Sequence, residues 1–169
     1  MKKLSAGLLV YRQSDGGVEV LIAHPGGPFW SKKDLGAWSL PKGEYQEDED
    51  ALTAACREFA EEIGRPAPEG QFIDLGEVKM KSGKLVHGWA VAGDLDATKI
   101  KSNTMSIEWP PKSGRQTEFP EVDKAEWFDL TSAAQKLHPV QAEFIQRLAE
   151  QLDLNIEPPA ELPQQSSLF

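Results

Sequence analysis

The feature that most constrains this chain is a crowded acidic segment, residues 43–64, which reads GEYQEDEDALTAACREFAEEIG. It contains eight carboxylates and one arginine. Like charges held this close repel one another and reduce stability unless a counter-charge relieves them. Carboxylates that converge on one point are typical of a cation site, whereas a solvated acidic surface needs only scattered Asp and Glu.

Within this segment, residues 50–63 have the pattern of an amphipathic helix. Apolar side chains recur at helical spacing, and Gly64 indicates the end of the helix. The apolar positions are Leu52, Cys56, Phe59 and Ile63. An acidic stripe of Glu58, Glu61 and Glu62 lies beside them. Because hard divalent cations take oxygen ligands, this stripe predicts a magnesium site. The alternative interpretation is a solvated acidic helix.

The remaining chain predicts strands around this helix, with more helix at the end, and therefore a mixed sheet covered by helices. The expected strands are residues 4–11, 18–24, 71–81, 84–93, 103–109 and 124–129, with a short strand end at Ser39–Leu40. Residues 25–38 and 110–123 are expected to be loops. A short helix is predicted from Thr131 and an amphipathic one at residues 139–152. Residues 1–153 are expected to form a single domain, followed by a mobile, proline-containing tail at residues 154–169.

Composition limits the classes of partner and the compartment. The net charge of -9 disfavours stable binding to nucleic acid or to an anionic membrane. Cys56 is the one cysteine among the 169 residues, so no internal disulfide can form and a cytoplasmic location is expected. The opening residues MKKLSAGLLVYRQ predict neither a signal peptide nor a membrane span. The oligomeric state cannot be read from the sequence.

The spacing of the acidic segment resembles the Nudix box of the Nudix hydrolase family. The family pattern is G-x5-E-x7-R-E-U-x-E-E-x-G-U, where U is a bulky aliphatic residue. The matching positions are Gly43, Glu49, Arg57, Glu58, Glu61, Glu62 and Gly64. Phe59 fills the first U position with an aromatic residue, and the last U position is Arg65. Both departures concern packing rather than the acids. Residues 43–65 are called the box below, and the wider resemblance extends over about residues 4–150.

This resemblance implies an α/β/α sandwich with a mixed β-sheet, in which the box forms a loop, a helix and a loop. It implies hydrolysis of a nucleoside diphosphate linked to another moiety, with Mg²⁺ or Mn²⁺ as cofactor. The expected metal ligands are Glu58, Glu61, Glu62, the backbone carbonyl of Lys42, and Glu121, which precedes Trp127 by six residues. Glu49 is the expected partner of Arg57, and Gly43, Glu49 and Gly64 have structural roles.

The expected catalytic residues are Glu58, Glu61, Arg57 and Glu121. The general base remains open between Glu58 and Glu121, because the family places it either in the box or on a later loop. For Glu121, an equally favoured interpretation is a solvated acid on a loop. Since two adjacent phosphates repel an attacking oxyanion, metal ions would neutralise them and lower the pKa of a bound water.

Substrate contacts are predicted from basic and aromatic residues outside the box. Lys32 and Lys33, with Trp38, Trp30 and Phe29 nearby, could form a phosphate clamp beside a base-stacking surface. The alternative is a solvated basic loop over packed aromatic residues. Lys42 and Arg115 are further candidates for phosphate contacts, and both could instead be merely exposed.

The histidines and the cysteine show no pattern that indicates a metal site or a nucleophile. His24, His87 and His138 lack metal-ligand spacing, and Cys56 lies on the apolar stripe of the predicted helix, which favours a buried thiol over a nucleophile.

Three function classes follow. The first is a metal-dependent pyrophosphohydrolase. The second is a non-catalytic nucleotide-sensing module, against which the complete set of box acids argues. The third is a calcium-binding or interaction protein, which would need an EF-hand-like loop that QEDED does not provide. Substrates in the family include dinucleoside polyphosphates, nucleoside triphosphates, ADP-ribose and nucleotide sugars. The compact chain favours the first two of these.

Overall fold

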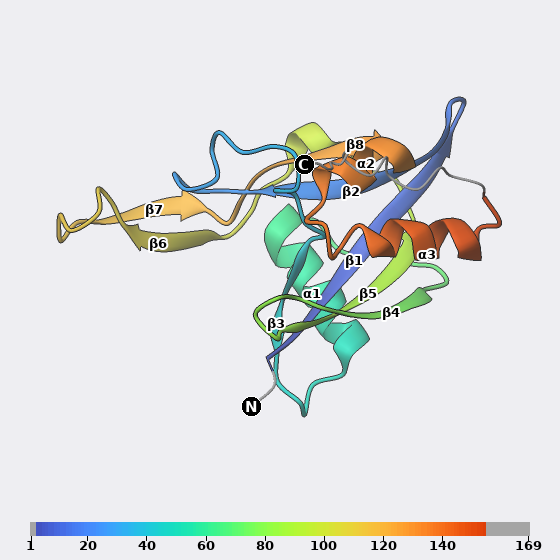
Figure 1. The fold of residues 1–169 in the computed structure, drawn as a ribbon, viewed down its shortest axis with the longest axis horizontal. Coiled ribbons are helices and arrows are strands. Elements are labelled where there is room, and N and C mark those ends of the chain that lie inside the picture. Colours follow the sequence, from blue (N-terminus) through green and yellow to red (C-terminus); the bar gives the residue numbers. More distant parts are fainter. Residues whose placement is uncertain (1–2, 155–169) are drawn as a thin grey trace, which may run out of the picture.

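The computed structural model describes residues 3–154 of the chain (Figure 1). The strands are β1 (Leu4–Ser14), β2 (Gly17–Pro25), β3 (Lys42–Tyr45), β4 (Ile73–Lys79), β5 (Leu85–Ala92), β6 (Thr104–Glu108), β7 (Gln116–Pro120) and β8 (Val122–Asp129). The helices are α1 (Ala51–Ile63), the 3-10 turn η1 (Ala97–Lys99), α2 (Leu130–Lys136) and α3 (Glu143–Gln151). The expected tail lies outside the described residues, apart from Leu154.

One mixed sheet organises the molecule, in the strand order β4-β5-β1-β2-β8, with β3 also paired to β1. β1 and β2 form an antiparallel hairpin whose last register pair is Ser14 with Gly17, so the DG sequence at 15–16 makes the turn. β1 runs parallel to β5 and antiparallel to β3. The expected mixed sheet is therefore confirmed.

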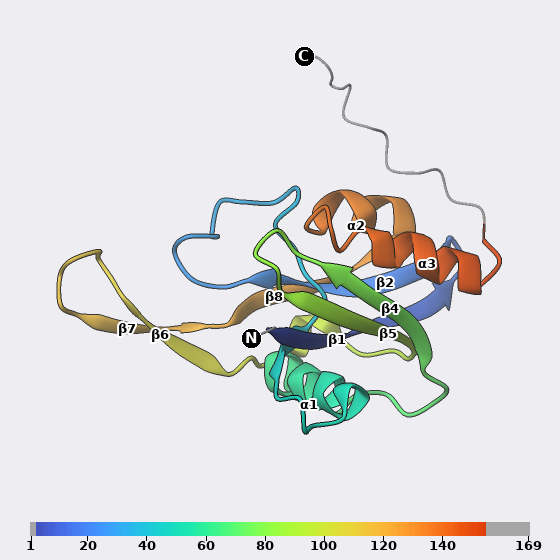
Figure 2. The same ribbon diagram turned by 60° about the horizontal axis from the view of Figure 1, so that its bottom comes forward.

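Helices cover the two faces of the sheet and complete three layers. Figure 2 shows α1 on one face and α2 with α3 on the other. The core on the α1 side contains Ala54, Phe59 and Ile63 packed against residues of β1 and β5. The core on the other side contains Phe144 and Leu148 of α3, in line with the amphipathic helix predicted near the end. Both sides together form the expected α/β/α sandwich.

Local signals set the ends of α1. The Asp50 carboxylate accepts the backbone N–H of Thr53 and caps the first turn. Gly64 ends the helix at φ +81°, a left-handed conformation that glycine adopts without the clash of a side chain. Its N–H donates to the carbonyl of Ala60. The box helix therefore begins and ends within a residue of the predicted limits.

The region after η1 differs from the prediction. Residues 110–123 were expected to be a loop, but they contain β7, which pairs antiparallel with β6. Residues 104–120 form a two-stranded hairpin, called the arm below, that extends away from the main sheet (Figure 1). β7 was missed because QTEFP is short and polar and follows PPKSGR, a segment that contains the turn formers Pro, Ser and Gly. A single residue, Glu121, separates β7 from β8.

Within residues 3–154, no helix combines the length and the apolar character that crossing a bilayer requires.

Candidate metal and catalytic site

Arg57 connects the loop before α1 to the helix itself. Its guanidinium donates to both carboxylate oxygens of Glu49, at 3.1 Å from Nε and 3.0 Å from Nη2. Nη1 donates to Glu58 at 2.6 Å and lies 3.5 Å from Glu61. Arg57 thus pairs with Glu49, as the resemblance implied, and partly neutralises two of the box acids.

Gly43 gives Glu58 the space that its carboxylate occupies. A Cβ built at Gly43 would lie 1.9 Å from Oε1 and 2.1 Å from Cδ of Glu58. No side chain larger than hydrogen fits there unless Glu58 moves. Burial raises the pKa of the Glu58 carboxyl above its ordinary value, while the hydrogen bond from Arg57 opposes that shift.

Glu62 is the most perturbed acid of the site. Its Oε1 accepts the backbone N–H of Lys42 at 3.3 Å. Burial, followed by the negative charge of Glu121, raises the pKa of Glu62 to about 8. Burial also lowers the pKa of the Lys42 ammonium. Glu62 therefore lies in surroundings that disfavour its negative charge unless a cation is present.

Glu121 reaches the box through a chain of backbone hydrogen bonds, called the backbone relay below. The N–H of Asn103 donates to the carbonyl of Glu61 at 3.0 Å, and the N–H of Glu121 donates to the carbonyl of Asn103 at 2.9 Å. The N–H of Gly26 then donates to the carbonyl of Glu121 at 2.8 Å. Burial and the charge of Glu61 raise the pKa of Glu121. The relay thus brings residue 121 beside acids that lie about sixty positions earlier in the sequence.

The donors of this site suit a hard divalent cation. Glu58, Glu61, Glu62 and Glu121 offer only oxygen atoms to an ion. Lys42, whose carbonyl was the further expected ligand, contacts Glu62 through its backbone N–H. Within residues 3–154, no three His, Cys, Asp or Glu side chains already lie close enough together to hold a metal ion. Arg57 engages Glu58, and Glu62 accepts from the Lys42 amide. The residues present fit a magnesium-type ion by donor chemistry.

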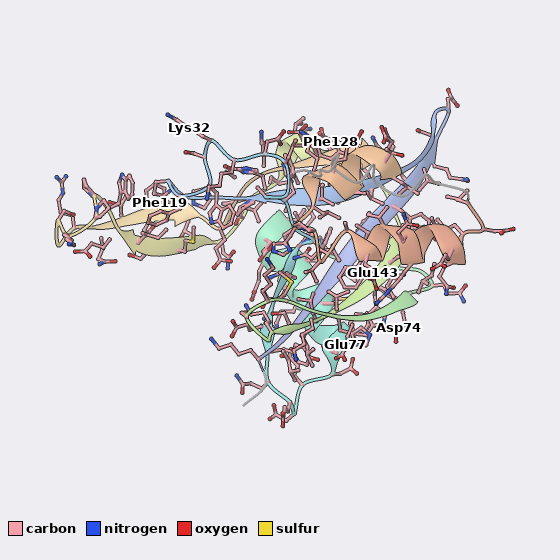
Figure 3. The ribbon with its side chains drawn as sticks, in the orientation of Figure 1. Lys32, Asp74, Glu77, Phe119, Phe128 and Glu143 are labelled. Carbon is pink, nitrogen blue, oxygen red and sulfur yellow. The ribbon has the colours of Figure 1, made fainter. Side chains whose placement is uncertain are left out.

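The candidate substrate residues are scattered. Lys32 is exposed on loop 26–38 and points away from the body of the molecule (Figure 3). The Lys33 ammonium lies 5.0 Å from the ring centroid of Trp30. Arg115 is exposed at the tip of the arm, and Figure 1 shows this tip extending away from α1. The structure does not bring Arg115 to the box.

Trp38 requires a correction. It was expected to contact substrate, but it is 1% exposed and belongs to the core beneath α2. Its indole N–H donates to Asp34 at 2.8 Å. A buried ring offers no face to a ligand, so Trp38 anchors the end of the loop instead. Phe29 and Trp30 are the aromatic residues that this loop exposes.

The histidines have structural partners. His24 is 3% exposed and bonds Asp123, which is 99 positions away, so no local sequence pattern could have revealed the pair. His87 stacks on Trp89 and bonds Asp74. Cys56 is partly buried, and burial raises the pKa of its thiol, which disfavours the reactive thiolate.

A pocket of about 330 Å³ lies elsewhere, between β4 and α3. Its lining includes Glu77, Val140 and Arg147. The Arg147 guanidinium already donates to the carbonyls of Leu75 and Glu77. Because α3 covers the face of the sheet opposite α1, this pocket is separate from the box acids.

Comparisons with known proteins agree with the box and the fold. A family model described as NUDIX domain matches residues 1–148. An Ap4A hydrolase from C. elegans, solved as a binary complex, is 20% identical with a TM-score of 0.62, over 88% of this chain and 98% of that chain. The NUDIX domain of Shewanella oneidensis NrtR, complexed with ADP ribose, is 19% identical with a TM-score of 0.62, over 90% and 89%.

A third solved structure, the MutT protein of Methanosarcina mazei Go1, is 19% identical with a TM-score of 0.57, over 89% of this chain and 95% of that one. No curated protein sequence matched the chain.

Proposed function

Because this chain belongs to the NUDIX domain family, we propose that it is a metal-dependent pyrophosphohydrolase. It cleaves a phosphoanhydride bond of a nucleoside diphosphate linked to another moiety. A dinucleoside polyphosphate or a nucleoside triphosphate is the favoured substrate. The similarity in fold to proteins named Ap4A hydrolase and MutT supports this choice.

The observation that carries the proposal is the placement of Glu62, which accepts the backbone N–H of Lys42 at 3.3 Å and lies near the charge of Glu121. Its pKa is raised to about 8 by burial and by the nearby charge of Glu121. A solvated acidic helix, the alternative interpretation, would leave its carboxylates in water. A half-buried group of acids beside one arginine is instead the arrangement that a bound cation would stabilise.

Each residue has a part in this proposal. Mg²⁺, or Mn²⁺ in its place, would be held by Glu58, Glu61, Glu62, Glu121 and the carbonyl of Lys42, and when bound it supplies charge neutralisation and an activated water. Arg57 is a positioning residue, because its bonds to Glu49 and Glu58 fix the loop against α1. Glu58 or Glu121 accepts the proton of the attacking water.

The test is hydrolysis of a nucleotide panel with Mg²⁺, with the products identified by chromatography. The panel includes a diadenosine polyphosphate, nucleoside triphosphates, ADP-ribose and a nucleotide sugar. The Glu62→Gln variant accompanies the wild type. Glu150→Gln serves as a matched control, since Glu150 is exposed on α3 and the chemical change is identical.

Cleavage of one substrate by the wild type and by Glu150→Gln, at least tens of times faster than by Glu62→Gln, would support the proposal and identify the substrate. Equal background rates from all three proteins on every substrate would overturn it. The non-catalytic nucleotide-sensing module would then be the better interpretation, and binding would be measured next.

A further inference from the structure

The loop between β2 and Trp38 exposes large aromatic side chains. Phe29 is 55% exposed and Trp30 is 39% exposed. Two adjacent aromatic rings that are exposed to solvent do not contribute the favourable free energy that burial of such rings normally provides. A ligand that stacks on them would restore it.

Hydrogen bonds hold this loop at both ends and in the middle. The N–H of Gly26 donates to the carbonyl of Glu121 at 2.8 Å, and the N–H of Gly36 donates to the carbonyl of Gln135 at 3.1 Å. In the middle, Nε2 of His24 bonds the carbonyl of Lys33 at 2.6 Å. The aromatic residues therefore project from a fixed segment rather than from a free one.

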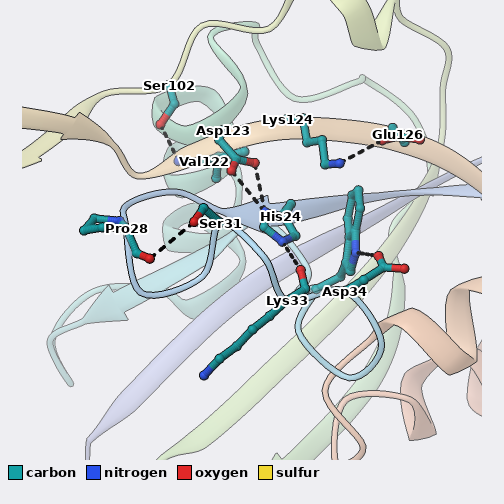
Figure 4. Close-up of polar contacts among 11 residues, drawn as sticks. His24, Pro28, Ser31, Lys33, Asp34, Ser102, Val122, Asp123, Lys124 and Glu126 are labelled. Carbon is teal, nitrogen blue, oxygen red and sulfur yellow. Dashed lines mark hydrogen bonds and ion pairs between the residues drawn. The ribbon is translucent and has the colours of Figure 1, made fainter.

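His24 is the central attachment, and Figure 4 shows it between Asp123 and Lys33. Its Nδ1 lies 2.9 Å and 3.1 Å from the two carboxylate oxygens of Asp123. His24 thus bridges the carboxylate of Asp123 and the carbonyl of Lys33, and it joins the loop to the start of β8, two residues after Glu121.

The arm supports the aromatic rings from one side. The ring of Phe29 meets the edge of Trp109 with centroids 5.5 Å apart and planes at 86°. A Cβ added to Gly27 would lie 3.0 Å from Cε of Met105, so the loop backbone lies directly against β6. These contacts leave Phe29 and Trp30 oriented but still exposed.

We propose that Phe29, Trp30 and Lys33 form a subsite for the nucleobase end of the substrate, with His24 as its positioning residue. The inference rests on the proposed function, because it concerns the same substrate. Bases stack on aromatic faces, and a neighbouring ammonium pairs with phosphate. The Lys33 ammonium beside the Trp30 ring provides both elements together. The bond from Gly26 to Glu121 connects this subsite to the box acids.

The first test measures binding without catalysis. Dissociation constants for ADP and for inorganic tripolyphosphate, which lacks a base, are measured by calorimetry with EDTA present. The proteins are wild type, Trp30→Ala, Trp30→Phe and Leu35→Ala. Leu35 is 68% exposed on the same loop and is the matched control for loss of an apolar side chain.

Trp30→Ala should weaken ADP binding about ten-fold or more, while tripolyphosphate binding stays unchanged. Trp30→Phe and Leu35→Ala should remain within about three-fold of the wild type. ADP binding that is undetectable in the wild type, or that Trp30→Ala leaves unchanged, would overturn the subsite. An equal loss for tripolyphosphate would also overturn it, because the base would then have no part.

His24→Gln tests the positioning role, since glutamine has one nitrogen and one carbonyl oxygen where His24 has two ring nitrogens that contact Asp123 and Lys33. It should raise KM for the nucleotide several-fold and leave kcat within about two-fold. An unchanged KM would remove His24 from the proposal, and so would a parallel fall in kcat, because a loss of fold or of catalysis would then explain the change.

The outcomes separate this inference from the proposed function. A wild type that hydrolyses no nucleotide but binds ADP in a Trp30-dependent way would retain the subsite and lose the hydrolase. If the wild type hydrolyses nucleotides and Trp30→Ala has the same KM, the proposed hydrolase function is retained and the subsite is rejected.

Discussion

Substitution of Gly43 by alanine tests the candidate site most directly. The added Cβ would lie 1.9 Å from Oε1 of Glu58, whereas ordinary van der Waals contact begins at 3.4 Å. The Glu58 carboxylate would have to move by about 1.5 Å. Misplacement of a catalytic group by about 1 Å can reduce a rate about 100-fold. We therefore expect kcat to fall at least about 100-fold, equivalent to about 2.7 kcal/mol of transition-state stabilisation.

The fold should survive this change. Gly43 is absent from the residues with positive φ, so its backbone accommodates alanine without strain. Gly→Ala at a compatible position commonly stabilises by about 0.4–1 kcal/mol through the unfolded chain. This stabilisation partly offsets the free energy needed to move the Glu58 side chain, and Tm should therefore change by only a few degrees.

The assay combines kcat on the substrate identified from the panel, Mn²⁺ affinity by electron paramagnetic resonance, and Tm. Gly16→Ala is the control, because a Cβ at Gly16 meets no atom within 4 Å and the residue lies in the β1–β2 turn. If Gly43→Ala keeps kcat within about three-fold of the wild type and binds Mn²⁺ equally well, the position of the Glu58 carboxylate does not govern the reaction, and the reasoning is refuted.

Three further predictions concern the metal, the box helix and the corrected tryptophan. Mg²⁺ at a hundred times its dissociation constant should stabilise the fold by about 2.7 kcal/mol, a rise in Tm of roughly 5–10 °C, and an unchanged Tm would count against the metal site. Gly64→Ala should lower the free energy of unfolding by roughly 1–3 kcal/mol in urea titrations, because φ is +81° and the Cβ would lie 2.4 Å from the carbonyl oxygen of Lys101. Trp38→Phe should cost roughly 1–3 kcal/mol of stability while KM stays within about two-fold, since Trp38 lies in the core; a large rise in KM without loss of stability would restore its predicted role in substrate binding.

The box helix was predictable because its signals are local. Apolar spacing and the glycine at 64 both act within a few residues, and the structure places α1 at Ala51–Ile63. The mixed sheet followed similarly from strand patterns, and the α/β/α sandwich followed from the resemblance. The acids at 58, 61 and 62 were identified by their positions in the box, and the roles assigned to them remain predictions.

What the sequence could not reveal depends on contacts between distant segments. Loop 26–38 contains several aromatic residues with similar neighbours in the sequence. Packing beneath α2 is what buries Trp38 while Trp30 stays exposed. Glu121 was expected near the box from its distance to Trp127, but the backbone bonds through Asn103 that place it there were not. No pattern of residue types encodes a hydrogen bond between peptide groups of remote segments.

The backbone relay has a consequence for how such a chain can diverge. Its three bonds join peptide groups of Glu61, Asn103, Glu121 and Gly26, so the side chains at 61, 103 and 121 take no part in them. Proline at 103 or 121 would abolish a link, and position 26 has no room for a side chain because a Cβ there would lie 2.0 Å from the carbonyl oxygen of Pro120. Carboxylate-to-amide exchange at 61 or 121 alters charge and leaves the connection between helix, arm and loop in place. Mutational drift could thus change what the chain recognises or how fast it reacts while the geometry that joins these segments is inherited intact.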